Sequence, residues 1–320
     1  MIRPRGTAVA AALFADALLG EPPEPAHPVV LIGRAISVFE GRVLALKGER
    51  RLKLAGLFLA AVLPALSFAL TRLALRLTPP KLRWPLEVGL LSTALSMRGL
   101  TRSALAVERE LEAGDLEAAR ARVGGLVGRD TEHLAPGEVA RAAVESVAEN
   151  TSDGVVAPML YAVLLGAPGA LAYKAVNTLD SMVGHPQPPY GDLGWASARL
   201  DDLANLLPAR LTALSVAAVS GRGLTTLATA RRYGPLTRSP NAGLVEAAFA
   251  GALGLELGGA NSYGGILRQG PLLGSGRPPE PADIRMAVSL MRRSCLLIIA
   301  LFLTAQGVAG GRIAGGQTGG

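Results

Sequence analysis

Acidic and amide side chains gather where one long uncharged stretch of the sequence begins. Residues 145–154 read ESVAENTSDG and lead directly into the uncharged run 155–173. Glu145 and Glu149 are four residues apart and share a helical face, where like charges repel unless a cation or basic ligand lies between them. Carboxylate oxygens suit Mg²⁺, which proteins usually hold through one or two carboxylates together with substrate phosphates. A solvated helix end with a cap for the next helix explains the same residues, and both interpretations stay open here.

Two further polar clusters follow that run. In the first, Lys174 and Asn177 lie on one helical face with Asp180 beside them. A lysine after an apolar run is also typical of an anchor at a membrane interface. In the second, Asp201 and Asp202 are adjacent and point to different faces, so that one can pair with a nearby arginine while the other faces a site.

A carboxylate and a proline-rich turn occur together near the N-terminus. Asp16 interrupts the apolar run 7–19, and a proline-rich turn ending in His27 follows. An ionisable group within a membrane segment is a functional hypothesis by default, and a snorkelling or helix-capping side chain is the alternative. We interpret this segment as a retained first helix and not as a signal peptide, because Asp16 breaks the apolar run.

A last cluster combines a helix cap with a glycine-rich loop. Ser239 or Asn241 is expected to cap a helix that contains Glu246, and the stretch 258–265 follows as a loop. Backbone amides in such a loop can cradle an anion, although a lone glycine-rich loop is a weak signal.

The elements that position these clusters are long apolar segments. Three uncharged stretches approach the length of about 20 residues that crosses a bilayer, namely 54–71, 155–173 and 294–309. Weaker segments lie at 7–19, 86–97, 203–220 and 242–260. The sequence therefore predicts an all-α, polytopic integral membrane protein. A soluble all-α protein with buried core helices is the alternative.

The segment 98–150 differs from its surroundings because it is rich in charge. Gly114 is expected to end one helix, Asp115 to cap the next, and Pro136 to start a third. We predict a single membrane-embedded catalytic domain over 1–320, in which 98–150 is a small soluble helical insert and 310–320 a flexible glycine-rich tail. No segment shows the alternation typical of strands, which argues against a Rossmann or P-loop domain.

Composition excludes several classes of protein. Half of the residues are hydrophobic, only 18% are charged, and the mean hydropathy is +0.35. One cysteine cannot form a disulfide scaffold, and one cysteine with three scattered histidines does not form a four-ligand zinc site. Aromatic residues make up only 4%, which argues against nucleic-acid binding through base stacking. The net charge of +7 therefore fits membrane-flanking cations and a site for anionic phosphate substrates.

The chain resembles the cobalamin-biosynthesis family called CobD or CbiB, the adenosylcobinamide-phosphate synthases. The resemblance runs from about residue 12 to 265. It rests on DALLGEPPEPAHPVVLIG (16–33), GRDTEHL (128–134), ESVAENTSDGVVAPMLYAVLLGAPGALAYKAVNTLDSMVGH (145–185), LGWASARLDDLANLLPARL (193–211) and SPNAGLVEAAFAGALG (239–254). The chain departs from the family pattern at 184–190, where we interpret His185 as part of a stiffened loop.

The resemblance implies a multi-pass enzyme of the plasma membrane with its active site facing the cytoplasm. It implies a ligase that joins adenosylcobyric acid to (R)-1-amino-2-propanol phosphate, or to free aminopropanol, with ATP and Mg²⁺. The adenosylcorrinoid is then a substrate, and association with other late corrin-pathway enzymes is expected. The relation of this family to the AmpE membrane proteins keeps a membrane sensor or transporter open as the alternative.

These implications assign provisional roles to the polar residues. The expected catalytic residues are Glu145, Glu149, Asn150, Asp153, Lys174, Asn177 and Asp180. The expected Mg²⁺ ligands are Glu149, Asp153, Asp180, Asp201 and Asp202, with Glu145 as a further candidate. The expected substrate-binding residues are Asp16, His27, Arg129, Asp130, Arg199, Asn241 and Tyr263.

The predicted crossings raise one conflict. If 155–173 and 203–220 both cross the bilayer, then 174–202 lies opposite 98–153, although ATP and corrinoid are cytoplasmic. We therefore predict that one of the two segments is re-entrant or that both line a cavity, where irregular backbone is tolerated at membrane depth.

Overall fold

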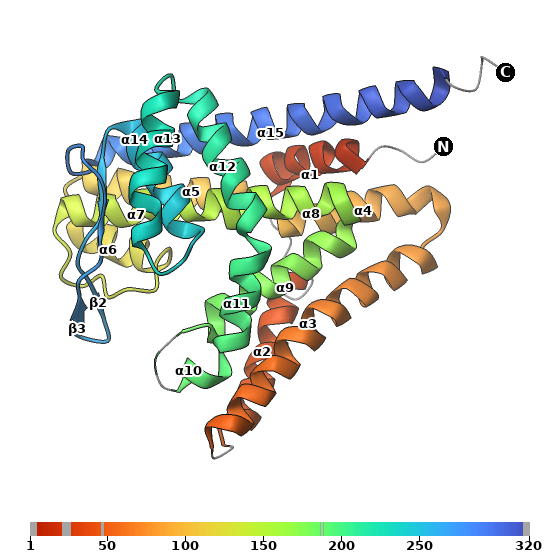
Figure 1. Ribbon diagram of the computed structural model, residues 1–320, viewed down its shortest axis with the longest axis horizontal. Coiled ribbons are helices and arrows are strands. Elements are labelled where there is room, and N and C mark those ends of the chain that lie inside the picture. The colour runs from red at the N-terminus through yellow and green to blue at the C-terminus, as the bar shows by residue number, and fades with distance from the viewer. Residues whose placement is uncertain (1–4, 21–26, 46–47, 186, 188, 316–320) are drawn as a thin grey trace. The chain divides into compact units, whose positions relative to one another are not determined.

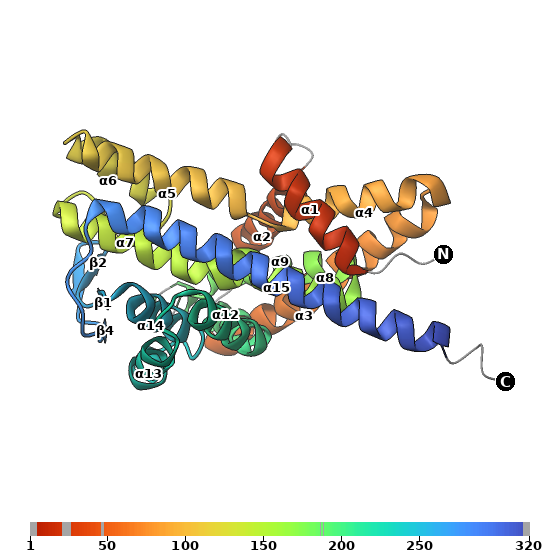
Figure 2. The ribbon, with the colours of Figure 1, turned by 90° about the horizontal axis from the view of Figure 1, so that it is seen from above.

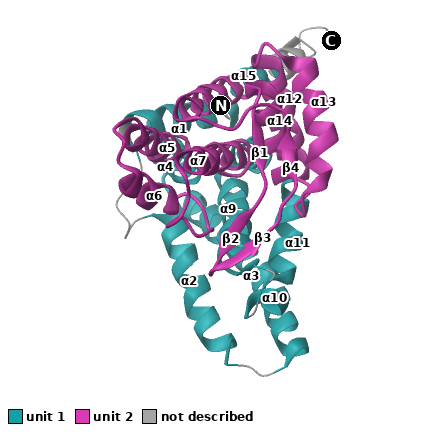
Figure 3. Ribbon diagram, turned by 90° about the vertical axis from the view of Figure 1, so that its left-hand side faces the viewer, with its two compact units in different colours: residues 1–96, 157–205, 299–320 teal, residues 97–156, 206–298 magenta. Residues whose placement is uncertain are grey.

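The computed structural model describes residues 5–20, 27–45, 48–185, 187 and 189–315. The chain forms two compact units, coloured separately in Figure 3. Unit 1 comprises 1–96, 157–205 and 299–320, and unit 2 comprises 97–156 and 206–298. Each unit is therefore built from pieces that are distant in the sequence.

Unit 1 is a set of helices around a small apolar core. Its helices are α1 (Arg5–Leu19), α2 (Pro28–Val43), α3 (Glu49–Leu77), α4 (Pro80–Ala94), α8 (Ala157–Leu165), α9 (Ala167–Val183), α10 (Tyr190–Leu193) and α11 (Trp195–Ala204). In the core, Ile36 of α2 and Leu59 of α3 pack against Leu179 of α9. Burying such aliphatic side chains stabilises the fold by roughly 1.5–3 kcal/mol each.

Unit 2 is organised around α7 (Pro136–Asn150). Every residue of α7 from Val139 to Ala148 is buried, including four alanines, so this helix is packed on all sides. The other helices are α5 (Met97–Glu112), α6 (Leu116–Gly124), η2 (Thr151–Val156), α12 (Leu206–Val219), α13 (Gly223–Tyr233), η3 (Gly234–Leu236) and α14 (Ala242–Leu253). Small side chains allow neighbouring backbones to approach α7 closely.

Unit 2 also contains strands that the sequence does not predict. They are β1 (Glu256–Gly258), β2 (Asn261–Tyr263), β3 (Ile266–Arg268) and β4 (Leu272–Gly274). β1 pairs antiparallel with β4, and β2 with β3. Figure 2 shows the strands near one end of α7. The other described elements are helices, in agreement with the predicted helical fold class. The strands gave no sequence signal because three-residue strands are too short to show a period of two.

Local signals in the charged segment give the helix boundaries. α5 ends at Glu112, and α6 begins after Asp115, whose carboxylate accepts a hydrogen bond from the Ala118 amide at 2.9 Å. α7 begins at Pro136. These boundaries agree with those predicted. The segment packs with 206–298 in one unit, and its description as an insert in a single domain stays a prediction.

Among the residues that the structure describes, two helices are long and apolar enough to cross a membrane (Figure 1). They are α3 and the Pro281–Gln306 part of α15 (Pro281–Gly315). α3 contains the predicted segment 54–71, and α15 as a whole contains 294–309. α3 exposes Leu57, Phe58, Leu66 and other large apolar side chains, which suit contact with lipid.

The third strongly apolar stretch, 155–173, is not one helix. Gly166 has a φ of 75°, which glycine adopts without strain, and it separates α8 from α9. α11 and α12 meet at a bend of 46°. They are long and apolar enough to cross a membrane only if the two helices together form one span. Both segments that produced the topological conflict are thus broken helices, whereas their re-entrance in a bilayer stays a prediction.

The predicted flexible tail over 310–320 stays a prediction. α15 continues to Gly315, so 310–315 is helical, and 316–320 lies outside the described residues. The first predicted helix is present as α1, while part of the proline-rich turn after it, 21–26, lies outside the described residues.

Candidate functional site

A cavity of about 320 Å³ lies in unit 2 between segments that are far apart in the sequence. The loop 126–129, α7, α14 and the β1–β2 segment contribute to its wall. Its polar lining residues are Arg129, Glu145, Ser146, Glu149, Glu246, Asn261 and Tyr263. Four of them, Arg129, Glu145, Glu149 and Tyr263, are predicted site residues.

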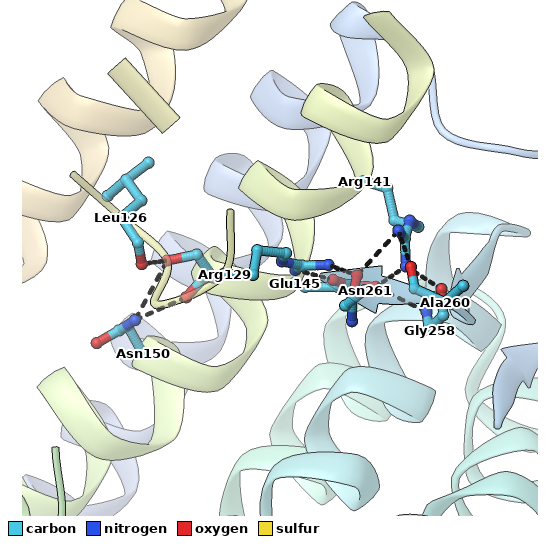
Figure 4. A network of polar contacts seen from close by, with 9 residues as sticks. Leu126, Arg129, Arg141, Glu145, Asn150, Gly258, Ala260 and Asn261 are labelled. Atoms are coloured by element: carbon cyan, nitrogen blue, oxygen red, sulfur yellow. Dashed lines mark hydrogen bonds and ion pairs between the residues drawn. The ribbon is translucent and has the colours of Figure 1, made fainter. Parts of the chain in front are cut away.

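The Glu145 carboxylate organises one wall of the cavity (Figure 4). It forms an ion pair with Arg129, and each of these side chains is only 8% exposed. Its Oε1 accepts a hydrogen bond from the Gly258 amide at 2.7 Å and lies 3.5 Å from the Arg141 guanidinium. Removing this carboxylate would leave two buried cations without their counter-ion.

Two arginines fasten the β1–β2 segment to this wall. Arg141 donates hydrogen bonds to the carbonyl oxygens of Gly258 and Ala260, the latter at 3.1 Å. Both Arg141 and Arg129 donate to the side-chain oxygen of Asn261. Figure 4 shows these groups meeting between α7 and the strand. Arg141 and Asn261 were not among the predicted site residues.

Glu246 is a further residue of this site, after Arg141 and Asn261, that sequence reasoning did not assign to it. It lies on α14, and its neighbours include Glu145, Glu149 and both arginines. Burial, followed by the negative charges of Glu145 and Glu149, holds the pKa of Glu246 well above its usual range. Its position inside the apolar run 242–260 was the signal that could have identified it.

Asp130 holds the turn that carries Tyr263. Its carboxylate accepts hydrogen bonds from the Gly264 and Gly265 amides at 2.9 and 2.8 Å and from the Ser262 hydroxyl at 2.7 Å. These donors lower the pKa of Asp130, the Gly265 amide most of all. In this structure the predicted substrate-binding Asp130 thus stabilises the β2–β3 turn.

A second polar cluster forms in unit 1, where α9 packs against α11. Lys174 donates to the side-chain oxygen of Asn177 at 3.2 Å, and Asn177 also hydrogen bonds to Asp201. Asp201 also accepts a hydrogen bond from the Asn205 side-chain amide at 2.9 Å. The second and third predicted polar clusters, from 174–181 and 195–210, therefore meet.

Further acidic groups border this cluster. Burial and the nearby charge of Asp202 raise the pKa of Asp180. Asp202 accepts a hydrogen bond at 3.3 Å from Arg199, a largely exposed side chain. The carboxylates of Asp180 and Asp202 repel each other, and a cation bound near them would relieve this repulsion.

The remaining predicted residues occupy separate positions. Asp16 is fully buried on α1, and His27 is the N-cap residue of α2. Asn241 is the N-cap residue of α14 and accepts a hydrogen bond from Arg210 at 2.8 Å.

On the helix that contains Glu145, Asn150 donates to the Ser146 carbonyl at 3.0 Å. Asp153 lies in the π-helical turn η2. His185 is exposed beside Tyr190, with the ring centroids 6.0 Å apart.

No group of three or more Asp, Glu, His or Cys residues able to hold a metal ion by itself is found in the part of the chain that the structure describes. The carboxylates instead come in smaller sets, such as Glu149 with Glu246 and Asp180 with Asp202. Such sets suit Mg²⁺ that is held partly by substrate phosphates and water. The predicted Mg²⁺ ligands stay a prediction.

Comparison with known proteins identifies the family. The family model described as CobD/Cbib protein matches residues 9–291. The chain therefore belongs to the CobD/CbiB family. Relatives within it include the cobalamin biosynthesis protein CobD of Klebsiella pneumoniae subsp. pneumoniae, which is 44% identical over 297 residues, covering 90% of this chain and 93% of the relative.

Other members of the CobD/CbiB family are similar over the same length. CobD of Synechocystis sp. is 42% identical, covering 90% of this chain and 88% of its own length. CbiB of Salmonella typhi is 40% identical, covering 91% of this chain and 94% of its own length. No solved structure matches the chain. The match to 9–291 includes both the unit 2 cavity and the α9–α11 cluster.

Proposed function

We propose that this protein acts in cobalamin biosynthesis as an adenosylcobinamide-phosphate synthase. The observation that carries the proposal is its membership of the CobD/CbiB family over 9–291, with relatives named cobalamin biosynthesis proteins. In the proposed reaction, ATP activates a carboxylate of adenosylcobyric acid as an acyl phosphate. The amine of aminopropanol phosphate then forms a C–N bond to the acyl carbon while the C–O bond to phosphate breaks.

The amine must lose a proton in this reaction, and the unit 2 cavity supports a role in that transfer. The charges of Arg129 and Glu145 offset each other in their ion pair, whereas Glu149 adds negative charge to the same cavity. A negative cavity attracts the ammonium form of aminopropanol phosphate. Its volume of about 320 Å³ suits this small substrate and is too small for a corrinoid.

Glu246 is the proposed proton acceptor. A general base works best when its pKa is close to the working pH, because it is then both available and sufficiently basic. The raised pKa of the Glu246 carboxyl brings it towards that condition. The Glu246 carboxylate takes one proton from the ammonium group, and the freed nitrogen lone pair then attacks the acyl carbon. The second N–H proton leaves with the departing phosphate as the amide forms. Glu149 remains to hold the substrate through its charge.

The α9–α11 cluster is proposed to serve the phosphates of ATP. Lys174 is buried beside Asn177 and supplies a positive charge, while Asp180 and Asp202 offer carboxylate oxygens. Asp201 is a further proposed Mg²⁺ ligand of this cluster, and Asp153 and Glu149 are separate proposed Mg²⁺ ligands within unit 2. When bound with ATP, Mg²⁺ offsets charge on the phosphate oxygens and so favours transfer to a carboxylate. Lys174 would orient the phosphates through charge-assisted hydrogen bonds.

The protein is proposed to lie in the plasma membrane with both polar clusters open to the cytoplasm, where ATP and corrinoid are found. The apolar helices α3 and α15 support this location. Association with other late corrin-pathway enzymes is a further part of the proposal, because the substrate is their product.

Purified full-length protein in detergent provides the test. Adenosylcobyric acid, aminopropanol phosphate, ATP and Mg²⁺ are supplied together, and the corrinoids are separated by chromatography and mass. We expect ATP-dependent formation of adenosylcobinamide phosphate. A folded protein that leaves the substrate unchanged, with phosphorylated or free aminopropanol, contradicts the proposal and favours an AmpE-like membrane sensor or transporter.

A further inference from the structure

A second and larger cavity in unit 2 is lined by four arginines. It has a volume of about 860 Å³ and lies between α5, α6 and α15. Its polar lining residues are Thr101, Arg102, Ser103, Arg109, Arg122 and Arg292. Arg102 and Arg109 are seven residues apart and so share one face of α5. No acidic residue of the described chain lines this cavity.

The cations of this cavity are largely uncompensated. Arg122 lies 3.6 Å from Glu110, whereas Arg102, Arg109 and Arg292 have no ion pair among the described residues. The nearby carboxylates of Glu108 and Glu112 bind Arg285, at 2.9 and 3.1 Å. Several guanidinium groups around one hollow form a binding site for phosphate, because their planar N–H forks match its oxygens.

A buried hydroxyl points to the same conclusion. Thr101 lines the cavity and is only 5% exposed, yet its hydroxyl has no hydrogen-bond partner in the part of the chain that the structure describes. A buried polar group without a partner is costly and needs an explanation. An oxygen-rich ligand in the cavity would provide that partner.

The position of Arg292 identifies the source of the phosphate. Arg292 and Arg293 immediately precede the uncharged segment 294–309 of α15, which is a candidate membrane span. Leu296 lies one helical turn beyond Arg292 on the same face and is 61% exposed. No aromatic side chain lines the cavity within the described chain, so a nucleotide base would have no stacking partner.

We propose that this cavity binds the phosphodiester headgroup of an anionic phospholipid, with an acyl chain lying along the Leu296 face of α15. Basic residues at the cytoplasmic end of a membrane helix attract anionic lipids. This site is separate from the proposed synthase site and does not depend on that activity. Its role is to hold unit 2 against the membrane surface.

Native mass spectrometry of the full-length protein tests the proposal. The protein in detergent receives an equimolar mixture of phosphatidylglycerol and phosphatidylcholine with the same acyl chains. Arg102→Gln/Arg109→Gln is compared with the control Arg231→Gln/Arg238→Gln, which removes two exposed arginines elsewhere in unit 2. We expect wild type and control to retain phosphatidylglycerol selectively, and the cavity variant to bind it about thirtyfold more weakly, since each such arginine contributes about fivefold.

Three results would overturn the proposal. One is equal phosphatidylglycerol retention by wild type and the cavity variant, and another is equal retention of the two lipids by wild type. In the third, inorganic triphosphate displaces phosphatidylglycerol from wild type and binds more tightly, which assigns the cavity to a soluble phosphate compound. This competition needs no variant, so it remains decisive even if the substitutions disturb folding.

Discussion

The Glu145 carboxylate accepts a hydrogen bond from the Gly258 amide at 2.7 Å, although 113 residues separate the two in the sequence. This bond, together with those from Arg141 to the Gly258 and Ala260 carbonyls, fixes β1 against the buried helix α7. The cavity wall opposite Glu246 therefore depends on one carboxylate.

Replacing that carboxylate is expected to destabilise unit 2. Glu145→Gln removes the negative charge that offsets Arg129 and Arg141, and leaving buried cations unpaired costs about 3 kcal/mol. We expect a clear drop in the thermal unfolding midpoint in detergent. Glu117→Gln is the matched control, because its partner Arg120 binds a largely exposed carboxylate and such pairs contribute under about 1 kcal/mol. Equal midpoints for the two variants would show that the Glu145 network adds nothing to stability.

The proposed base Glu246 predicts a specific pH profile. Its carboxylate form is needed to accept a proton, so kcat/KM should rise with pH through a pKa well above the usual 4.3. Glu246→Gln is expected to lower activity about a hundredfold or more and to abolish this acidic limb. Glu280→Gln, an exposed change elsewhere in unit 2, is the control. If kcat/KM of Glu246→Gln still rose with pH as in wild type, a group other than Glu246 would cause that rise, which would contradict the proposed role.

The same raised pKa predicts an effect on stability. The folded protein holds the Glu246 proton more tightly than the unfolded chain does, so this contribution is complete below about pH 4.3 and is lost as pH rises through the folded pKa. Glu246→Gln mimics the protonated form. The unfolding midpoint of Glu246→Gln, measured relative to that of wild type, should therefore increase from pH 5 to pH 8. A difference between the two midpoints that does not change with pH would contradict the prediction.

Asp130 predicts the opposite pH dependence in the β2–β3 turn. Its pKa is lowered in the folded state, so its contribution is present above the unfolded value of about 3.9 and is lost as pH falls through the folded pKa. Asp130→Asn should speed hydrogen exchange at the Gly264 and Gly265 amides at neutral pH. Asp115→Asn, which changes a cap of α6, should leave these two amides protected. Unchanged exchange in Asp130→Asn would contradict the turn-holding role.

Cysteine labelling tests whether the two polar clusters face the same compartment. The native Cys295 is buried, so labelling of introduced cysteines meets little background. His133→Cys lies in unit 2 and Asp192→Cys in unit 1, next to the α9–α11 cluster in sequence. In sealed vesicles, a membrane-impermeant maleimide should label both from the cytoplasmic side. Labelling from opposite sides would exclude a shared cytoplasmic site.

Local signals in the sequence were sufficient for several elements. Asp115 and Pro136 marked helix starts because capping and the first helical turn depend only on neighbouring residues. The spacing of Lys174 and Asn177 likewise predicted a contact within one helix, which the structure contains. Apolar length alone identified the regions that became α3 and α15.

Other features depended on contacts between distant segments. Arg141 looked like an ordinary helix arginine, and only the packing of β1 against α7 gives it partners more than a hundred residues away. The break at Gly166 was hidden inside a continuous apolar run. Glu246 was visible as a charge within an apolar segment, but its acidic neighbours come from α7.

The synthase assay with two variants tests the central claim most directly. Wild-type full-length protein should convert adenosylcobyric acid and aminopropanol phosphate to adenosylcobinamide phosphate only when ATP and Mg²⁺ are present. Glu149→Gln and Glu246→Gln should fold normally and lose most of this activity, whereas the exposed control Glu117→Gln should retain it. A folded wild-type protein without ATP-dependent product would contradict the proposed function. Full activity in both cavity variants would contradict the proposed site.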